Sequence, residues 1–396
     1  MKEEIYKSER KLKTVLSRIK DSDISENNKK AILQFHDECF SQGISSIRVL
    51  KCVYTLFRLS KWLNKDFIDV NIEDIKALVG MIEKSDFAEW TKHDYKVILK
   101  KFYKWLRGNE DFPTEVKWIK TTMKNNRQKL PEELLTEEEV KKLIESANEP
   151  RDRALVSVLY ESGCRIGELL SLKIKEIDFD KYGALLSVIG KTGSRRVRIV
   201  ASSPYLAEWI NKHPMKDNPD APLWIRKDYT NKLLSYERVK VILIHLKKKS
   251  GIKKKVNPHN FRHSRATFLA NFLTEAQLKE MFGWTQSSDM ASIYVHLSGR
   301  DVDNALLRTY GIEQDEKNGH ESELKPKECI RCKQVNPVTN KFCSMCGMVL
   351  NEKTIVEVIE KDLERKKADE VLDELIKDEK FREMFLNKIK EVVNKH

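Results

Sequence analysis

Apolar side chains recur every three or four positions through residues 1–125, and this spacing predicts a domain built of helices. The pattern is clearest over Ile44–Lys65 and Trp90–Arg107. In both segments a second face carries lysines and arginines at similar spacing. Such a face is typical of a solvated surface, and it also suits a helix that lies along a phosphate backbone. A polar, basic stretch containing a proline then predicts an interdomain linker over 126–134.

Residues 135–312 mix helical and strand periodicity and form the second predicted domain. The domain begins with Thr136 as the N-cap of a helix and Glu139 three residues later, the two residues of a capping box. Alternating apolar positions predict two strands, Ala184–Ile189 and Arg195–Val200, joined by a glycine-flanked hairpin turn. Further helices are predicted over Arg151–Tyr160, over Gly167–Leu172 and from Tyr236 onward.

Three shorter segments complete the chain. Residues 313–326 predict a second linker, residues 327–350 contain clustered cysteines, and the charged residues 353–396 predict one or two amphipathic helices. No run without a charge exceeds ten residues, the length of Phe342–Asn351, whereas a membrane-spanning helix needs about 20 apolar residues. The charged N-terminal segment lacks the apolar core of a secretory signal. We therefore expect a cytoplasmic protein that has no membrane partner.

Charge is distributed unevenly along the chain. Of its 396 residues, 74 are Lys or Arg and 61 are Asp or Glu, which gives a net charge of +13. Residues 1–130 carry 27 basic and 19 acidic side chains (+8), residues 131–312 carry 30 and 23 (+7), and residues 313–396 carry 17 and 19 (−2). The basic first three-quarters indicates a polyanionic partner, most simply nucleic acid, although an ordinary lysine-rich surface would give the same counts.

Four of the seven cysteines form a C-x₂-C-x₁₀-C-x₂-C cluster, made of Cys329, Cys332, Cys343 and Cys346. Each C-x₂-C turn lets two thiolates converge, and two such turns complete a tetrahedral shell of four sulfurs. We predict one structural zinc per chain, because four thiolates leave no open coordination position; iron in a rubredoxin-like site is the main alternative. A ribbon of this size buries little core, so metal binding would supply its folding energy.

Several residues of the second domain suit phosphate chemistry. They lie in four separate segments: Arg165 at the start of a helical turn, Lys191 in the hairpin turn, His259 and Arg262 on one helical face, and Trp284 followed ten residues later by Tyr294. Each signal is weak when it is taken alone.

Together, in this order and at these spacings, these residues resemble the tyrosine recombinase (phage integrase) family. The layout extends over about residues 1–312, and the specific signal lies in 160–311. The segment GWTQSSDMASIYVHLSGRDVDNALL and the cysteine cluster after it look similar to archaeal integrases in particular. The resemblance implies a mainly α multidomain fold. Its parts would be a helical core-binding domain, an α+β catalytic domain with a small β-sheet, a zinc ribbon and a helical tail.

The resemblance also implies a role for each site residue. Arg165 and Arg262 match the two catalytic arginines, Lys191 the lysine of the β-hairpin, His259 the histidine of the H-x-x-R box, and Tyr294 the nucleophile. Trp284 occupies a sixth position that is usually histidine, and the gap to Tyr294 is one residue longer than in bacterial Xer-type members. We interpret Glu168, His263 and His296 as supporting or structural residues.

These residue types make physical sense for cleaving a phosphodiester without a metal or ATP. Two arginines can clamp the non-bridging oxygens, where negative charge develops. Tyr294 must lose a proton from a phenol of pKa about 10, so a nearby base such as His259 helps. Lys191 could protonate the departing 5′-oxygen, whereas Trp284 offers one indole N–H and no acid–base chemistry. The product is a 3′-phosphotyrosine that stores the bond energy for rejoining.

We therefore expect a site-specific recombinase for DNA integration, excision or resolution. Its partners would be double-stranded DNA and other copies of the chain, as a tetramer on two DNA sites, with the helix at Asp301–Ile312 packing on a neighbouring protomer. One alternative is a type IB topoisomerase, which shares the residue roles but would relax DNA without sequence preference. The other is a non-catalytic, zinc-containing DNA-binding module, which would form no covalent adduct with DNA.

Overall fold

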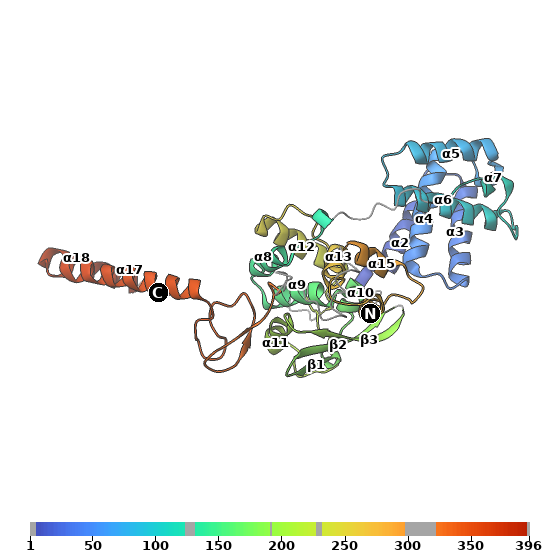
Figure 1. Cartoon of the computed structure of the whole chain (residues 1–396). Helices are drawn as coiled ribbons and strands as arrows, with labels where there is room; N and C mark the ends of the chain where they lie inside the picture. The colour runs from blue at the N-terminus through green and yellow to red at the C-terminus, as the bar shows by residue number, and fades with distance from the viewer. Residues whose placement is uncertain (1–4, 123–130, 191, 227–231, 298–321, 394–396) are drawn as a thin grey trace, which may run out of the picture. The chain divides into compact units, whose positions relative to one another are not determined.

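The computed structural model describes residues 5–122, 131–190, 192–226, 232–297 and 322–393 (Figure 1). The chain divides into two compact units, Met1–Glu133 with Ile225–Val239, and Leu134–Trp224 with Lys240–His396. Helices dominate both units, and a small antiparallel sheet lies in the second. The mainly α fold class predicted from the sequence is thus confirmed. Among the described residues, no helix has the length and apolar character that crossing a membrane requires.

The first unit is built from helices around an aromatic core. These helices are α2 (Ser8–Lys20), α3 (Glu26–Ser41), α4 (Ser46–Leu63), α5 (Ile72–Lys84), α6 (Glu89–Leu106) and α7 (Thr114–Lys117). Phe102 of α6 is fully buried and contacts two other rings edge-on, Phe35 at 5.3 Å and Phe67 at 4.8 Å between ring centroids. The predicted helices at Ile44–Lys65 and Trp90–Arg107 are confirmed as α4 and α6.

The cationic faces of α4 and α6 are largely engaged by acids of neighbouring helices. Arg48 and Lys51 of α4 both pair with Asp94 of α6, and Lys96 of α6 pairs with Glu83 of α5 at 2.7 Å. Three further cations of the two faces also pair with acids: Lys61 with Asp23 in the turn after α2, Lys65 with Asp74 of α5, and Arg107 with Glu115 of α7. These contacts favour the solvated-face interpretation for those cations over dedicated phosphate binding.

A three-stranded antiparallel sheet, ordered β1-β2-β3, forms one part of the second unit. The strands are β1 (Ile177–Asp180), β2 (Gly183–Gly190) and β3 (Gly193–Ile199). The predicted hairpin is confirmed, with β2 and β3 paired from Ala184 opposite Ile199 to Gly190 opposite Gly193. Strand β1 was not predicted from the sequence. Only its first residue is buried, so the strand lacks the alternation of apolar and polar positions on which such a prediction depends.

The second unit also contains helices. They are α8 (Glu137–Ser146), α9 (Pro150–Ser162), α10 (Ile166–Leu170), α11 (Ser203–Asn211), α12 (Tyr236–Ser250, which begins in the first unit), α13 (Pro258–Leu269), α14 (Glu275–Phe282) and α15 (Met290–Leu297). The predicted capping box is confirmed, because Thr136 Oγ1 accepts from the backbone of Glu139 while Glu139 Oε2 accepts from that of Thr136. Helix α9 is buried on nearly all sides and packs against α8, α11 and α13, so it is the central helix of this unit.

The C-terminal part contains a short two-stranded sheet and two helices (Figure 1). The elements are β4 (Lys327–Glu328), β5 (Val335–Asn336), α17 (Glu352–Ile376) and α18 (Glu379–Val393). The prediction of one or two tail helices is confirmed. The helix predicted at Asp301–Ile312 lies outside the described residues.

Candidate active site

Arg165 lies at the junction of two helices. Helix α9 ends at Gly163, whose φ of +56° favours glycine, and a Cβ there would lie 2.4 Å from the ring of Phe282. Arg165 then serves as the N-cap of α10. Its guanidinium donates to Glu168 Oε1 at 2.8 Å and to the Gly283 carbonyl at 3.1 Å. The side chain keeps 35% of its surface exposed, so part of the guanidinium is open to a ligand.

Glu168 is a buried carboxylate that links Arg165 to a second arginine, Arg195 of β3. Arg195 Nη2 donates to Glu168 Oε2 at 2.8 Å, and Arg195 is itself 9% exposed. Burial alone would raise the pKa of Glu168, but the hydrogen bonds and charges of Arg195 and Arg165 lower it below its usual value. Glu168 is therefore a carboxylate at neutral pH and holds both guanidinium groups in place, which agrees with the supporting role predicted for it.

Helix α13 carries Arg262. Asn257 caps the helix by accepting from the backbone of Asn260 at 2.9 Å, and Pro258 occupies the first turn. The guanidinium of Arg262 is buried and donates to the Gly163 carbonyl at 2.8 Å and to the Phe282 carbonyl at 2.6 Å. Burial, and next the charge of Arg165, lowers the pKa of Arg262 to about 10, so it remains a cation at neutral pH.

The C-terminal end of α14 binds three arginines. Three successive backbone carbonyls each accept from a different guanidinium: Met281 from Arg195 at 2.9 Å, Phe282 from Arg262 at 2.6 Å, and Gly283 from Arg165 at 3.1 Å. Carbonyls in the last turn of a helix have no partner within the helix and carry its partial negative charge, so cations are stabilised there. This end of α14 therefore brings two of the predicted catalytic arginines to one place.

Tyr294 and Trp284 stack face to face beside this arginine cluster. Their ring centroids lie 5.4 Å apart with an interplanar angle of 4°, and Trp284 stacks in turn on Phe282 at 4.9 Å. Arg262 lies over the ring of Trp284, 5.4 Å from its centroid. Tyr294 is 3% exposed, and burial raises its pKa to about 12 although the charge of Arg262 opposes the shift. A buried phenol of this kind needs a base before it can act as a nucleophile.

The base in contact with Tyr294 differs from the one suggested by the sequence. His263 Nδ1, rather than His259, contacts the hydroxyl of Tyr294, and His259 Nε2 lies 2.8 Å from His263 Nε2. The sequence reasoning assigned His263 to a supporting role. The sequence did contain a signal that His263 lies near His259: the two histidines are four residues apart, and residues at this spacing share one face of a helix.

Lys191 lies outside the described residues, but its neighbours place the end of the hairpin at the site. Gly190 and Gly193 pair across the turn, and Thr192 Oγ1 donates to the Gly283 carbonyl at 3.2 Å. The structure thus brings Arg165, His259, Arg262, Trp284 and Tyr294 together with the hairpin that carries Lys191. The side chain of His296 is also outside the described part of the chain.

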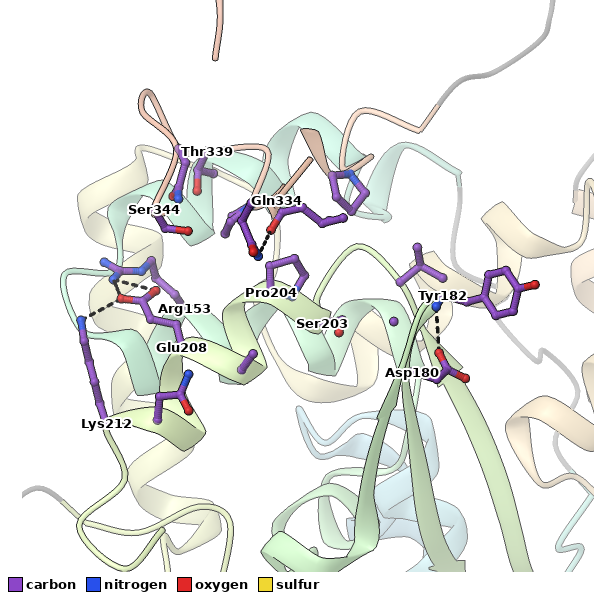
Figure 2. A pocket seen from close by; sticks show the side chains of 18 of the residues that line it. Arg153, Asp180, Tyr182, Ser203, Pro204, Glu208, Lys212, Gln334, Thr339 and Ser344 are labelled. Carbon is purple, nitrogen blue, oxygen red and sulfur yellow. Dashed lines mark hydrogen bonds and ion pairs between the residues drawn. The ribbon is translucent and has the colours of Figure 1, made fainter. Parts of the chain in front are cut away.

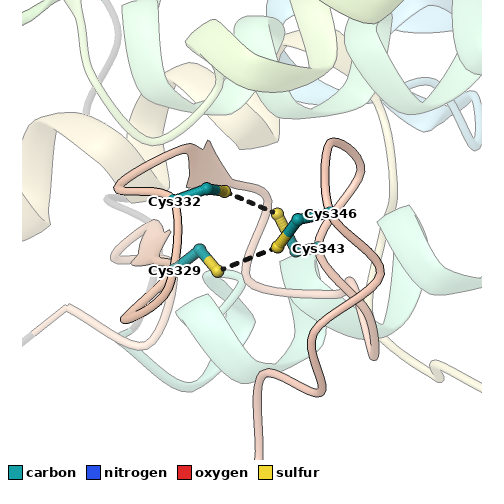
Figure 3. A group of neighbouring side chains, drawn as sticks. All are labelled: Cys329, Cys332, Cys343 and Cys346. Atoms are coloured by element: carbon teal, nitrogen blue, oxygen red, sulfur yellow. Dashed lines mark hydrogen bonds between the residues drawn. The ribbon is translucent and has the colours of Figure 1, made fainter.

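The four clustered cysteines converge on one point (Figure 3). All four Sγ atoms lie within 4.8 Å of one another, with 3.6 Å between Cys329 and Cys346 and 3.5 Å between Cys332 and Cys343. Zn–S bonds of about 2.3 Å in a tetrahedron put sulfurs about 3.8 Å apart, so the thiols fit such an ion. A hydrogen bond from the Cys346 backbone is the main cause that lowers the pKa of Cys343, whereas the neighbouring thiols raise the pKa of Cys332, so the shifts within the cluster have opposite directions.

A cavity of about 1010 Å³ lies within the second unit, between the ribbon (residues 327–350) and the helices α9 and α11 (Figure 2). Arg153, Glu208 and Lys212 line one side, where Glu208 pairs with Arg153 at 3.1 Å and with Lys212 at 2.9 Å. Thr339 and Ser344 of the ribbon line the other side. The lining includes none of the predicted catalytic residues, so this cavity is separate from the arginine–tyrosine cluster.

Comparison with known proteins identifies a family and relatives that match this chain. Residues 133–300 match the phage integrase family. The tyrosine recombinase XerA of Pyrococcus furiosus is 36% identical over 193 residues, which cover 47% of this chain and 65%, just under two thirds, of that relative. XerA of Pyrococcus horikoshii is 27% identical over 267 residues, covering 66% of this chain and 87% of that relative.

A solved structure shares the fold. The XerH site-specific recombinase bound to palindromic difH substrate, in a post-cleavage complex, aligns with a TM-score of 0.54. The alignment covers 78% of this chain and 95% of that chain at 19% sequence identity. The likeness to this structure therefore concerns the arrangement of the elements alone, and the family match with the two XerA relatives confirms the predicted resemblance.

Proposed function

Because residues 133–300 belong to the phage integrase family, the tyrosine recombinases, we propose that this protein is a site-specific DNA recombinase that acts through Tyr294. The observation that carries the proposal is the convergence of Arg165, Arg262 and Tyr294, which come from three separate segments and meet at the end of α14. Two cations beside a buried phenol fit in-line attack on a phosphodiester, because they stabilise charge on the non-bridging oxygens.

The two arginines would contribute unequally. Each guanidinium has five N–H donors, and Arg262 uses some of them on two backbone carbonyls, so it is a rigid, buried cation. Arg165 is more exposed and is oriented by Glu168, which leaves its open side for a phosphate oxygen. In this arrangement Arg165 makes the more direct phosphate contact, while Arg262 supplies charge and holds the stack of Trp284 and Tyr294 in place.

A strand-exchange assay tests the proposal against the topoisomerase alternative. The purified protein is incubated with two DNA molecules that carry candidate sites from the host genome, and exchange of flanking strands is followed on a gel. A site-specific recombinase exchanges strands at one sequence and leaves others intact. Relaxation of supercoils without any sequence preference and without exchange would instead support a type IB topoisomerase.

We propose that Lys191 protonates the departing 5′-oxygen, and sulfur substitution tests this role. An alcohol leaves poorly because its pKa is near that of water, about 15.7, whereas a thiol of pKa about 8.5 leaves as a thiolate without help. A substrate with sulfur at the 5′-bridging position should therefore restore cleavage by Lys191→Ala toward the wild-type rate. The same substrate should not restore Arg165→Ala. Failure to restore Lys191→Ala would assign Lys191 to clamping or positioning the phosphate.

We also propose that the four cysteines hold one structural zinc ion, which the convergence of their Sγ atoms supports. Cys329→Ser should lose the metal and unfold the ribbon, because metal binding provides most of the folding free energy of such a small module. Cys164→Ser, at a buried cysteine outside the cluster, serves as the control and should retain one zinc per chain. Elemental analysis checks both variants, and a folded ribbon with no metal would contradict the proposal.

The remaining assignments follow from the same function. Double-stranded DNA is the proposed substrate, and the helical first unit is proposed to share in binding it. The resemblance to tyrosine recombinases implies a homotetramer on two DNA sites, and this is the proposed active assembly. A cytoplasmic location, where the DNA lies, is part of the same proposal.

A further inference from the structure

The hydroxyl of Tyr294 begins a line of proton-binding atoms that leads toward solvent. His263 Nδ1 is in hydrogen-bond contact with Tyr294 Oη, and His263 Nε2 lies 2.8 Å from His259 Nε2. The three side chains pass from buried Tyr294 through half-buried His263 to exposed His259. A proton released inside the site therefore has a continuous route outward.

The contact between His263 and His259 restricts which histidine tautomers allow a proton to pass from Tyr294 toward His259. Two ring nitrogens 2.8 Å apart must share one proton, so one nitrogen donates and the other accepts. If His259 Nε2 accepts, His263 carries its proton on Nε2 and presents a lone pair on Nδ1 to the phenol. After His263 Nδ1 takes the phenol proton, it donates back to the Tyr294 oxygen, and His263 Nε2 still donates to His259 Nε2. No side chain has to rotate.

Among the described residues, Trp284 and Arg262 also neighbour Tyr294, and neither can take its proton. The indole of Trp284 stacks on the ring and has a donor but no acceptor. Arg262 is a cation, and its guanidinium donates to two backbone carbonyls. Its charge favours the phenolate once the proton has left, so Arg262 assists the transfer without receiving the proton.

We propose that His263 is the general base that receives the proton of Tyr294, and that His259 orients His263 and passes the proton outward. The inference rests on the proposed function. As the Oη–P bond forms, the Oη–H bond breaks and its proton moves to His263 Nδ1. The P–O5′ bond breaks at the same phosphorus, and the leaving oxygen takes a different proton, from Lys191. His263 is then a catalytic residue that contacts a reacting atom, and His259 acts through it.

The tautomer can be measured on the intact protein without DNA, so this test is independent of recombinase activity. Nitrogen-15 NMR of histidine-labelled protein, with assignments from His263→Asn and His259→Asn, reports which ring nitrogen carries the proton. The proposal predicts that in neutral His263 the proton is on Nε2 and the lone pair on Nδ1. A proton on Nδ1 of neutral His263 would overturn it, because His263 would then donate to the phenol and could not accept from it.

The second test separates base catalysis from a structural role. His263→Asn retains a hydrogen-bonding group near the Nδ1 position but is no base at neutral pH, and it should slow adduct formation on nicked DNA by about 100-fold or more. Replacing Tyr294 with a fluorinated tyrosine that ionises near pH 7 should restore most of that loss, because this phenol needs no base. His245→Gln, at an exposed position of α12 in the second unit, is the matched histidine control and should leave the rate unchanged.

Failure of the inference and failure of the proposed function give different results. If wild type forms adducts and His263→Asn forms them equally fast, the function stands and the base assignment is overturned. If His263→Asn is slow and the fluorinated tyrosine does not restore it, His263 is a structural residue and the assignment is again overturned. If wild type forms no adduct with any candidate site, the proposed function fails, while the NMR result still decides the tautomer of His263.

Discussion

Replacing Tyr294 with phenylalanine is expected to abolish covalent protein–DNA adducts while DNA affinity stays nearly unchanged. Phenylalanine retains the ring that stacks on Trp284 at 5.4 Å and loses only the hydroxyl that contacts His263. The loss of the attacking oxygen removes the proposed chemical step, whereas the phosphate contacts proposed for Arg165 and Arg262 remain. Adducts are trapped on nicked substrates, from which the short cleaved fragment diffuses away, and are counted by denaturing gel electrophoresis.

Tyr205→Phe provides the matched control for this prediction. Tyr205 is also a buried tyrosine of the second unit, and its hydroxyl bonds to Thr339 at 2.7 Å, away from the arginine cluster. This variant should form adducts at the wild-type rate. Adducts that persist in Tyr294→Phe, or disappear in Tyr205→Phe, would mean that another residue is the nucleophile.

The second large effect is expected at Arg262. Lysine retains the positive charge but cannot donate in a planar fork to the carbonyls of Gly163 and Phe282. Arg262→Lys should lower the cleavage rate by about 100-fold, because a lysine cannot hold the stack of Trp284 and Tyr294 in place and a small misplacement of the nucleophile has an effect of that size. It should also reduce the free energy of unfolding by about 1–3 kcal/mol, because a buried carbonyl loses its partner.

Arg198→Lys is the control for Arg262. Arg198 lies on β3 and forms a partly exposed ion pair with Asp180 at 2.6 Å. Its replacement should change the unfolding free energy by less than about 0.5 kcal/mol. Urea unfolding measures both variants. Equal destabilisation of the two would show that the buried contacts of Arg262 contribute nothing particular to the fold.

Local patterns predicted those elements whose residues meet the core in a regular period. The capping box of Thr136 and Glu139, the β2–β3 hairpin and the long helices of the first unit all follow from spacing along the chain. Strand β1 does not, because one buried residue, Ile177, gives no alternation to detect. Its position in the sheet depends on pairing with β2, which is a tertiary contact.

The cationic faces show a different limit of sequence reasoning. Spacing correctly placed Arg48 and Lys51 on one face of α4, but it could not show that Asp94 of a different helix lies between them. An ion pair of this kind depends on how two helices pack. The charge of a single helical face is therefore a weak guide to what the face binds.

The candidate site was predictable in its residue types and not in its contacts. The motifs around Arg165, Arg262 and Tyr294 could be recognised from spacing, and their assigned roles stay predictions. The arrangement at the end of α14 could not be recognised from the sequence, because Met281, Phe282 and Gly283 contribute backbone carbonyls rather than side chains. The contact between His263 and Tyr294 likewise depends on the placement of α15 against α13.

Mass spectrometry of the trapped adduct tests the central claim most directly. After nuclease and protease digestion, the peptide that carries a residual nucleotide is sequenced, and the linkage is identified as 3′ or 5′. We predict that the nucleotide is attached to Tyr294 through a 3′-phosphate. A nucleotide on any other residue, or a 5′-phosphate linkage at Tyr294, would contradict the proposed mechanism.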